Sequence, residues 1–180
     1  MGEFFLNTAR LKFSIWSNEE ITSALELWGN PETTKFITAD GKMSEYQIKE
    51  RLNKEIATYD RYGIQYWPVY LKETNDFIGC CGLRPYDPEN IILEMGIHLN
   101  DKFWRKGYAY EACSAVIDYA FKNFKVNGIF AGHNPKNVAS SKLLKKLGFK
   151  YMKDEFYPPT GLYHPSYMIT KEDYKLYTLK

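Results

Sequence analysis

The ten residues Phe103-Trp104-Arg105-Lys106-Gly107-Tyr108-Ala109-Tyr110-Glu111-Ala112 contain a basic turn centred on a glycine. An alternating apolar segment ends before them at Leu99, and helical spacing begins after Gly107. The N-terminus of a helix offers unpaired N–H groups and the positive end of the helix dipole. Because Gly107 has no Cβ, the backbone there can approach an anion closely. The segment therefore predicts an anion cradle, and the competing interpretation is a solvated basic turn that begins a helix.

Three strands are predicted before this turn, approximately at residues 63–71, 77–84 and 91–99, with turn-forming residues between them. Pro68 lies inside the first of them and has no N–H to donate to a neighbouring strand. We therefore expect that strand to be at an edge of the sheet or to contain a bulge.

Helices are predicted by capping boxes and by apolar residues at helical spacing. The sequences Ser17-Asn18-Glu19-Glu20 and Ser44-Glu45-Tyr46-Gln47 have the capping-box form, and helices are also expected near 107–121 and 137–146. With strands at 11–16, 128–131, 149–156 and 162–170, the element order becomes β-α-α-β-β-β-α-β-α-β-β. Hairpins mixed with crossover helices predict an α+β (mixed α/β) fold.

The bulk properties limit the classes of function. A length of 180 residues fits one domain, taken as residues 1–180, and a net charge of +2 gives no reason to expect a nucleic-acid partner. No apolar run approaches the ~18 residues of a membrane span. The adjacent Cys80 and Cys81 point to opposite faces of a strand, so we interpret them as small buried hydrophobic residues of a reduced, cytoplasmic protein. The three histidines lack metal-ligand spacing with the cysteines, so no metal site is expected.

Several motifs resemble one enzyme superfamily. Trp104-Arg105-Lys106-Gly107-Tyr108-Ala109 is similar to the pyrophosphate loop of GNAT acetyltransferases, Gln/Arg-x-x-Gly-x-Gly/Ala, with tryptophan in the first place. Glu94-Met95-Gly96-Ile97-His98-Leu99 resembles the strand before that loop. Asn137-Val138-Ala139-Ser140, followed by Leu147-Gly148-Phe149, resembles the Asn-x-x-Ser…Leu-Gly-Phe helix of the branch that acetylates ribosomal-protein N-termini. The likeness covers approximately residues 9–175.

The resemblance implies a mostly antiparallel central sheet with helices on both faces, with acetyl-CoA as cosubstrate and an amine as acceptor. It also implies that strand backbone groups contact the pantetheine arm and that loop amides contact the pyrophosphate. The cofactor-binding residues expected on this basis are Ile97, His98, Leu99, Arg105, Lys106, Gly107, Tyr108, Ala109, Tyr110 and Asn137. For Asn137 a helix N-cap is the competing role.

The chain departs from the superfamily at two catalytic positions. Leu144 stands where many members have a tyrosine acid, and Gly132 stands where some N-terminal acetyltransferases have a glutamate base. The resemblance leaves Ser140 as the group that protonates the CoA thiolate. It also makes Glu155, which precedes the final hairpin turn, a candidate base.

Glu94 is the other candidate base. Strand alternation places it with His98 on the face opposite Leu93 and Met95. A carboxylate on a central strand faces a cleft or a charged partner, so Glu94 is interpreted either as the base or as half of an ion pair. His98 is expected to be a structural histidine with proton relay as the alternative, and His164 is a candidate cleft residue.

The amine itself is expected to be a protein N-terminal α-amine. At neutral pH an α-amine with a pKa of about 7.7–8.0 is neutral in a far larger fraction than a lysine with a pKa of about 10.4, so one glutamate would suffice as base. The alternatives are a small amine (aminoglycoside, polyamine or amino-acid-like), favoured by an acidic cleft, or a non-catalytic acyl-CoA sensor. That acidic cleft would use Glu32, Asp40, Asp154 and Glu155. The chain is expected to be a monomer or a homodimer.

Overall fold

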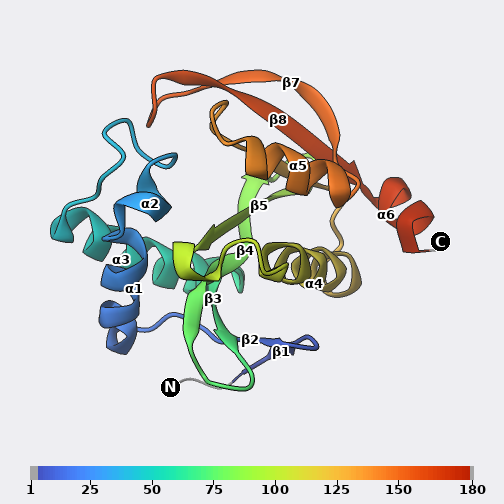
Figure 1. Cartoon of the computed structure of the whole chain (residues 1–180). Coiled ribbons are helices and arrows are strands. Elements are labelled where there is room, and N and C mark those ends of the chain that lie inside the picture. The colour runs from blue at the N-terminus through green and yellow to red at the C-terminus, as the bar shows by residue number, and fades with distance from the viewer. Residues whose placement is uncertain (1–3, 179–180) are drawn as a thin grey trace.

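The computed structural model describes residues 4–178, and the side chains of residues 4–176. One eight-stranded sheet runs through the molecule in the order β1-β2-β3-β4-β5-β6-β8-β7 (Figure 1). All neighbours are antiparallel except β5 and β6, which are parallel. This confirms the predicted α+β fold with a mostly antiparallel sheet. The strands are β1 (Leu6–Asn7), β2 (Leu11–Phe13), β3 (Tyr66–Leu71), β4 (Phe77–Asp87), β5 (Ile92–Leu99), β6 (Gly128–Gly132), β7 (Lys150–Tyr157) and β8 (Leu162–Thr170).

Helices cover both faces of the sheet, as predicted. In Figure 1, α1 and α3 lie on one side of the central strands and α4 lies on the other. Each face has its own buried cluster: Leu52 of α3 packs with Trp16 and Trp28, whereas Val116 of α4 packs with Ile129 of β6. The helices are α1 (Ile21–Trp28), α2 (Pro31–Thr34), α3 (Glu45–Tyr62), α4 (Tyr108–Asn123), α5 (Val138–Lys146) and α6 (Lys171–Thr178), with 3-10 turns at Asn18–Glu20 and Asp101–Phe103.

Both predicted capping boxes are present. Ser44 Oγ accepts from the Gln47 N–H, and the Gln47 side chain accepts from the Ser44 N–H, which satisfies two donors at the start of α3. Ser17 and Glu20 make the same reciprocal pair before α1. Cys80 and Cys81 are buried free thiols in opposite clusters, which confirms their interpretation as packing residues.

The edge-strand alternative for Pro68 is wrong, and the bulge is present. β3 lies inside the sheet between β2 and β4, and its register with β4 shifts between Val69 and Tyr70. Pro68 is tolerated because the pairing of β3 with β2 ends at Val69 and does not include residue 68. The Pro68 carbonyl accepts a hydrogen bond from the Ser14 N–H at 3.1 Å.

The final helix α6 was not predicted, nor was the single-turn α2. A third capping box was present in the sequence: Thr170 Oγ1 accepts from the Asp173 N–H at 3.1 Å, and the Asp173 carboxylate accepts from the Thr170 N–H at 3.2 Å. The Thr170-x-x-Asp173 signal was hidden because it overlaps the end of the last strand. None of the helices within residues 4–178 has the length and apolar composition to cross a membrane.

The sheet opens at its centre. β5 pairs with β6 only from Ile92 to Glu94, whereas its pairing with β4 continues to Leu99. Glu94 pairs with Phe130 of β6, and after Phe130 the strand β6 pairs with β8 alone. Residues 95–99 of β5 are therefore left without a β6 partner. This separation of two neighbouring strands positions the candidate site.

Candidate active site

Two adjoining cavities meet where β5 and β6 separate. The cavity at the N-terminus of α4, here called the helix-end cavity, has a volume of about 550 Å³. The second has a volume of about 410 Å³, and we call it the aromatic cavity because Tyr66, Tyr86, Phe130 and Tyr157 line it. Ser140 of α5 lines both cavities, so it lies at their junction.

The helix-end cavity has the geometry of an anion cradle. Gly107 is the N-cap of α4 with φ +83°, and as a glycine it provides no side-chain cap for the helix. Arg105 also has a positive φ, +59°, which costs a residue with a side chain about 1–2 kcal/mol. Such strained backbone is found at ligand sites, and uncapped helix N–H groups attract anions. The backbone conformation therefore has the features on which the predicted cradle depends.

Arg10 braces this loop from the far end of the sheet, which the sequence did not suggest. Its Nη1 donates to the Lys106 carbonyl at 3.0 Å, and its Nε pairs with the Glu111 carboxylate at 2.7 Å. Thr8 Oγ1 donates to the same carboxylate at 2.6 Å. The loop and the first turn of α4 are therefore tied to the N-terminal strands.

All of the expected cofactor-binding residues line the helix-end cavity except Lys106. The Lys106 carbonyl is taken by Arg10, and its ammonium lies 5.4 Å from the centre of the Phe103 ring. Along β5, the Leu99 carbonyl already accepts from Trp104 Nε1 at 2.8 Å and from Thr33 Oγ1 at 3.4 Å. The backbone of residues 95–98 is therefore the freer part of the exposed strand edge.

Asn137 performs the capping role that competed with cofactor binding. It is the N-cap of α5, and its Oδ1 accepts from the Ser140 N–H at 3.2 Å. It also lines the helix-end cavity. The cap holds the first turn of α5, and with it Ser140, at the junction of the two cavities.

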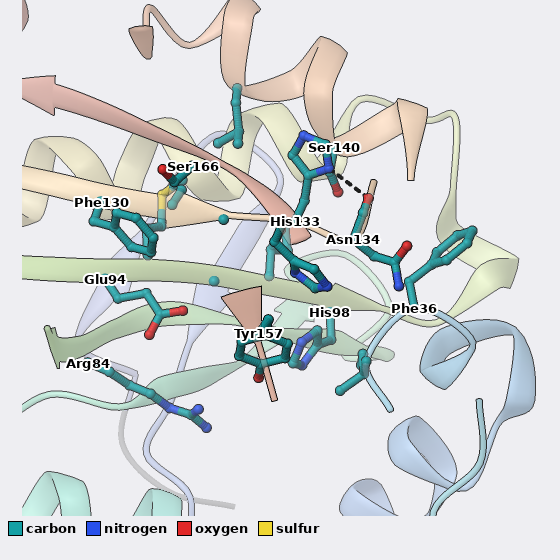
Figure 2. Close-up of a pocket in the computed structure, with 18 of the residues that line it drawn as sticks. Phe36, Arg84, Glu94, His98, Phe130, His133, Asn134, Ser140, Tyr157 and Ser166 are labelled. Carbon is teal, nitrogen blue, oxygen red and sulfur yellow. Dashed lines mark hydrogen bonds between the residues drawn. The ribbon is translucent and has the colours of Figure 1, made fainter. Parts of the chain in front are cut away.

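Glu94 lies in the aromatic cavity at the point where the sheet opens. Figure 2 shows the Glu94 carboxylate and the Arg84 guanidinium extending from neighbouring strands into the pocket. The two residues are register partners across β4 and β5. Burial raises the pKa of Glu94 above the ordinary 4.5, although Arg84, the Tyr66 hydroxyl and Arg51 oppose that rise. A carboxylate with a raised pKa is a better proton acceptor at neutral pH than an ordinary one.

Gly96 allows Tyr66 to lie against β5. A Cβ at position 96 would lie 2.2 Å from the Tyr66 ring, so any side chain there would displace the ring. Tyr66 is 4% exposed, and burial raises the pKa of its hydroxyl well above 10. Tyr66 therefore remains a neutral wall of the aromatic cavity beside Glu94.

His98 is the structural histidine that was expected. Its Nδ1 accepts from the indole N–H of Trp28 at 3.3 Å, so in the neutral ring the proton is on Nε2. Burial, Arg51 and Arg84 lower the pKa of His98 well below 6.5. A neutral His98 with both nitrogens assigned in this way is a donor at Nε2 and not a base.

His133, which was not expected to bind metal, has one ring nitrogen without a hydrogen-bond partner among the described residues. Its Nδ1 lies 2.8 Å from the Asn134 carbonyl, which can only accept, so Nδ1 carries the proton and Nε2 has a lone pair. That Nε2 is buried and has no hydrogen-bond partner among the described residues. His133 lines both cavities, one residue beyond β6.

Glu155 lines the aromatic cavity from β7, but its carboxylate is already engaged. It accepts from the Tyr86 hydroxyl at 3.3 Å and pairs with Lys153 at 3.0 Å, with 29% of its side chain exposed. His164 also lines this cavity, with Nε2 2.7 Å from Thr160 Oγ1. Of the two candidate bases, Glu94 is therefore the one with the more buried surroundings.

The floor of the aromatic cavity carries arginines that sequence reasoning did not single out. Arg51 of α3 and Arg84 of β4 line it, and Arg84 pairs with the fully buried Glu55 of α3. No local motif marks these residues, because their proximity depends on how α3 packs on the sheet. Among the acidic residues expected to form a cleft, Glu155 lines the aromatic cavity and Glu32 lines the helix-end cavity, whereas Asp40 and Asp154 line neither.

Two segments far apart in the sequence close over the aromatic cavity. The Ala39 N–H donates to the Pro159 carbonyl at 3.0 Å, which joins the loop after α2 to the β7–β8 hairpin. Phe36 and Ile37 from that loop, and Phe156 and Tyr157 from the hairpin, line the cavity.

Comparisons with known proteins identify the family. The model of the acetyltransferase (GNAT) domain matches residues 10–150. An N-acetyltransferase of Bacillus licheniformis named p20, described as uncharacterized, is 32% identical over 147 residues, which cover 81% of this chain and 82% of the relative. A GNAT-family acetyltransferase from Bacillus anthracis has a crystal structure with a TM-score of 0.78 and 26% identity, covering 93% of this chain and 99% of that one.

Two further solved structures share the fold at lower identity. RimL, the ribosomal L7/L12 α-N-protein acetyltransferase in complex with CoA, has a TM-score of 0.79 at 12% identity, covering 93% of this chain and 98% of that one. Spermidine N-acetyltransferase from Vibrio cholerae, with CoA and spermine, has a TM-score of 0.77 at 17% identity, covering 93% and 99%. The matched domain, the relative from Bacillus licheniformis and the shared fold all indicate the same family. The chain belongs to the GNAT acetyltransferase family and is an acetyl-CoA-dependent N-acetyltransferase.

Proposed function

We propose that a primary amine enters the aromatic cavity and that the CoA portion of acetyl-CoA occupies the helix-end cavity. The observation that carries this proposal is the position of Glu94 in the aromatic cavity, at the last β5–β6 pair before the two strands separate. Acetyl-CoA supplies an acyl group activated as a thioester, and the residues of the chain hold it and move protons.

The residues that would hold the cosubstrate fit its chemistry. The amides at the start of α4, at residues 108 and 109 after the left-handed Gly107, offer donors to a pyrophosphate. The unpaired edge of β5 at residues 95–98 offers backbone groups to the amides of a pantetheine arm, in the manner of an added strand. Arg10, which braces the loop, fixes the direction of these donors.

Glu94 is proposed as the general base. Its carboxylate takes a proton from the amine nitrogen while the new N–C bond forms and the thioester C–S bond breaks. Ser140, at the junction of the cavities, would supply a hydroxyl proton to the departing sulfur, and solvent can also supply it. The Nε2 of His133, which has no hydrogen-bond partner among the described residues, is the alternative base.

The first test combines binding and turnover. Acetyl-CoA at millimolar concentration should raise the melting temperature, because a ligand that binds only the native state stabilises it by mass action. Release of free CoA thiol should then depend on an added amine from a panel of peptides and small amines. No melting-temperature shift in a folded sample would contradict the binding proposal, and a shift without turnover for any amine would identify an acyl-CoA sensor.

A further inference from the structure

Arg51 is a half-buried cation that makes no ion pair within the described residues. Within the part of the chain that the structure describes, its guanidinium makes no hydrogen bond and no ion pair, and its Nε is buried. Its guanidinium lies over the Trp28 ring, whose centre is 4.9 Å from Cζ. Arginine remains protonated in proteins, so this charge cannot be removed by losing a proton. A buried charge is costly unless it is paired, and Arg51 opens onto the aromatic cavity.

The neighbouring charges do not supply that partner. Glu55 is fully buried and is already committed: one oxygen pairs with Arg84, and the other accepts the Tyr66 N–H at 3.0 Å. Arg84 lies over the Tyr66 ring at 4.1 Å, and its own Nε is also buried without a partner. Two guanidinium groups therefore face one committed carboxylate.

Glu94 is the remaining carboxylate near this floor, and the proposed function gives it another task. As the base it becomes neutral when it accepts the amine proton. At that moment Arg51 and Arg84 are opposed only by Glu55, so the floor carries a net positive charge. An acceptor that brings its own carboxylate would balance this charge, and a polyamine would add to it. A planar guanidinium also matches a carboxylate in a bidentate pair.

We propose that Arg51 binds a carboxylate of the amine acceptor, so that the acceptor is a small amino acid or a close analogue. This inference rests on the proposed function, because it assumes that the amine occupies the aromatic cavity. The cavity, at about 410 Å³, is within the size range of small-molecule sites. The stacked Tyr86 and Phe130 rings, 3.9 Å apart, form an apolar wall for the side chain of such an acceptor.

The experiment compares matched acceptors on the full chain. The proteinogenic L-amino acids are each assayed beside their carboxamide, with spermidine and short peptides as further acceptors, by acetyl-CoA-dependent thiol release. An amino acid should exceed its carboxamide by at least about 30-fold in kcat/KM, the loss expected when a buried charge is left unpaired. Equal rates for acid and amide, or preference for spermidine or for peptides without a nearby carboxylate, would overturn the inference and leave the acetyltransferase function standing.

Variants on α3 assign the effect to Arg51. Arg51→Met should remove the preference for the acid over the amide, mainly through KM, while the melting-temperature shift caused by acetyl-CoA is kept. Arg51→Lys should restore part of it. Arg61→Gln is the matched control, because Arg61 is exposed on the same helix and stacks on Tyr62 at 5.1 Å. A full preference in Arg51→Met would show that the carboxylate site lies elsewhere.

A binding measurement separates this inference from the proposed function. With CoA bound, the preferred amino acid should raise the melting temperature of the wild type more than its carboxamide does, and Arg51→Met should not show that difference. If no amine is acetylated, the proposed function fails, and this shift alone still decides whether Arg51 binds a carboxylate. Absence of the difference in the folded wild type would overturn the inference.

Discussion

The helix-end cavity and the aromatic cavity are neighbours, but they are built in different ways. The first takes the largest share of its wall from one continuous segment, residues 97–110, and its proposed ligand contacts are backbone amides. The floor of the second is assembled from α3, β3, β4 and β5, and its chemistry lies in side chains. A site formed by one continuous segment can be predicted from the sequence, whereas a site assembled from distant segments cannot. The two regions should therefore respond differently to substitution.

The largest effect is expected in the aromatic cavity. Glu94→Gln should lower turnover by roughly 10²–10⁴-fold, because it removes the proposed general base, while acetyl-CoA still raises the melting temperature. Steady-state kinetics and a thermal-shift assay measure the two quantities on the same sample. Glu155→Gln is the control and should change turnover far less, because Glu155 is already paired with Lys153.

The pH profile gives this prediction a sign. Because burial raises the pKa of Glu94, its carboxylate form is lost, as pH falls, at a higher pH than for an ordinary glutamate. Below that pKa, both the amine and Glu94 must lose a proton, so log kcat/KM should rise with a slope of about two, and Glu94→Gln should reduce that slope to about one. Near-wild-type turnover in Glu94→Gln would make His133 Nε2 the base instead.

The next effect concerns how the charged residues under the aromatic cavity contribute to the free energy of unfolding. Glu55→Gln should lower the free energy of unfolding by about 3–5 kcal/mol, because it leaves the Arg84 charge buried without its partner. Arg51→Met should be neutral or stabilising, since Arg51 has no anionic partner among the described residues. Denaturant unfolding of both variants measures the difference. Equal destabilisation by the two substitutions would mean that Arg51 is paired in solution.

A smaller effect is expected at the loop. Gly107→Ala should lower the free energy of unfolding by about 1–2 kcal/mol, the cost of a left-handed residue with a Cβ, and should also weaken the acetyl-CoA melting-temperature shift. Gly63→Ala is the matched control: Gly63 has φ +69°, nothing lies within 4 Å of a Cβ there, and it ends α3. An undiminished shift in Gly107→Ala would place the phosphates elsewhere.

The smallest effect is expected at the junction of the two cavities. Ser140→Ala should reduce turnover by less than the ~10²-fold typical of a general acid or base, because solvent can also protonate a thiolate. Stopped-flow measurement of thiol release would resolve this step. A loss as large as that of Glu94→Gln would contradict this prediction. It would mean that protonation of the thiolate by Ser140 matters as much for turnover as the general base.

The sequence alone determined the local elements and the helix-end cavity. Capping boxes at Ser17 and Ser44 set the starts of two helices, and Gly107 after a strand predicted the cradle, because each signal involves residues close in the chain. Strand alternation placed Glu94 and His98 on one face correctly for the same reason. The errors occurred where a signal needed its surroundings, as at Pro68, whose strand lies inside the sheet.

Only the tertiary structure decided the chemistry of the aromatic cavity. Arg51 and Glu55 lie one helical turn apart on α3, and nothing near them in the sequence indicates that Arg84 of β4 lies between them and Glu94. The free lone pair of His133 likewise depends on a contact with the Asn134 carbonyl. Local hydrogen bonding and periodicity are encoded within a few residues, but burial and charge pairing arise only when distant segments pack together.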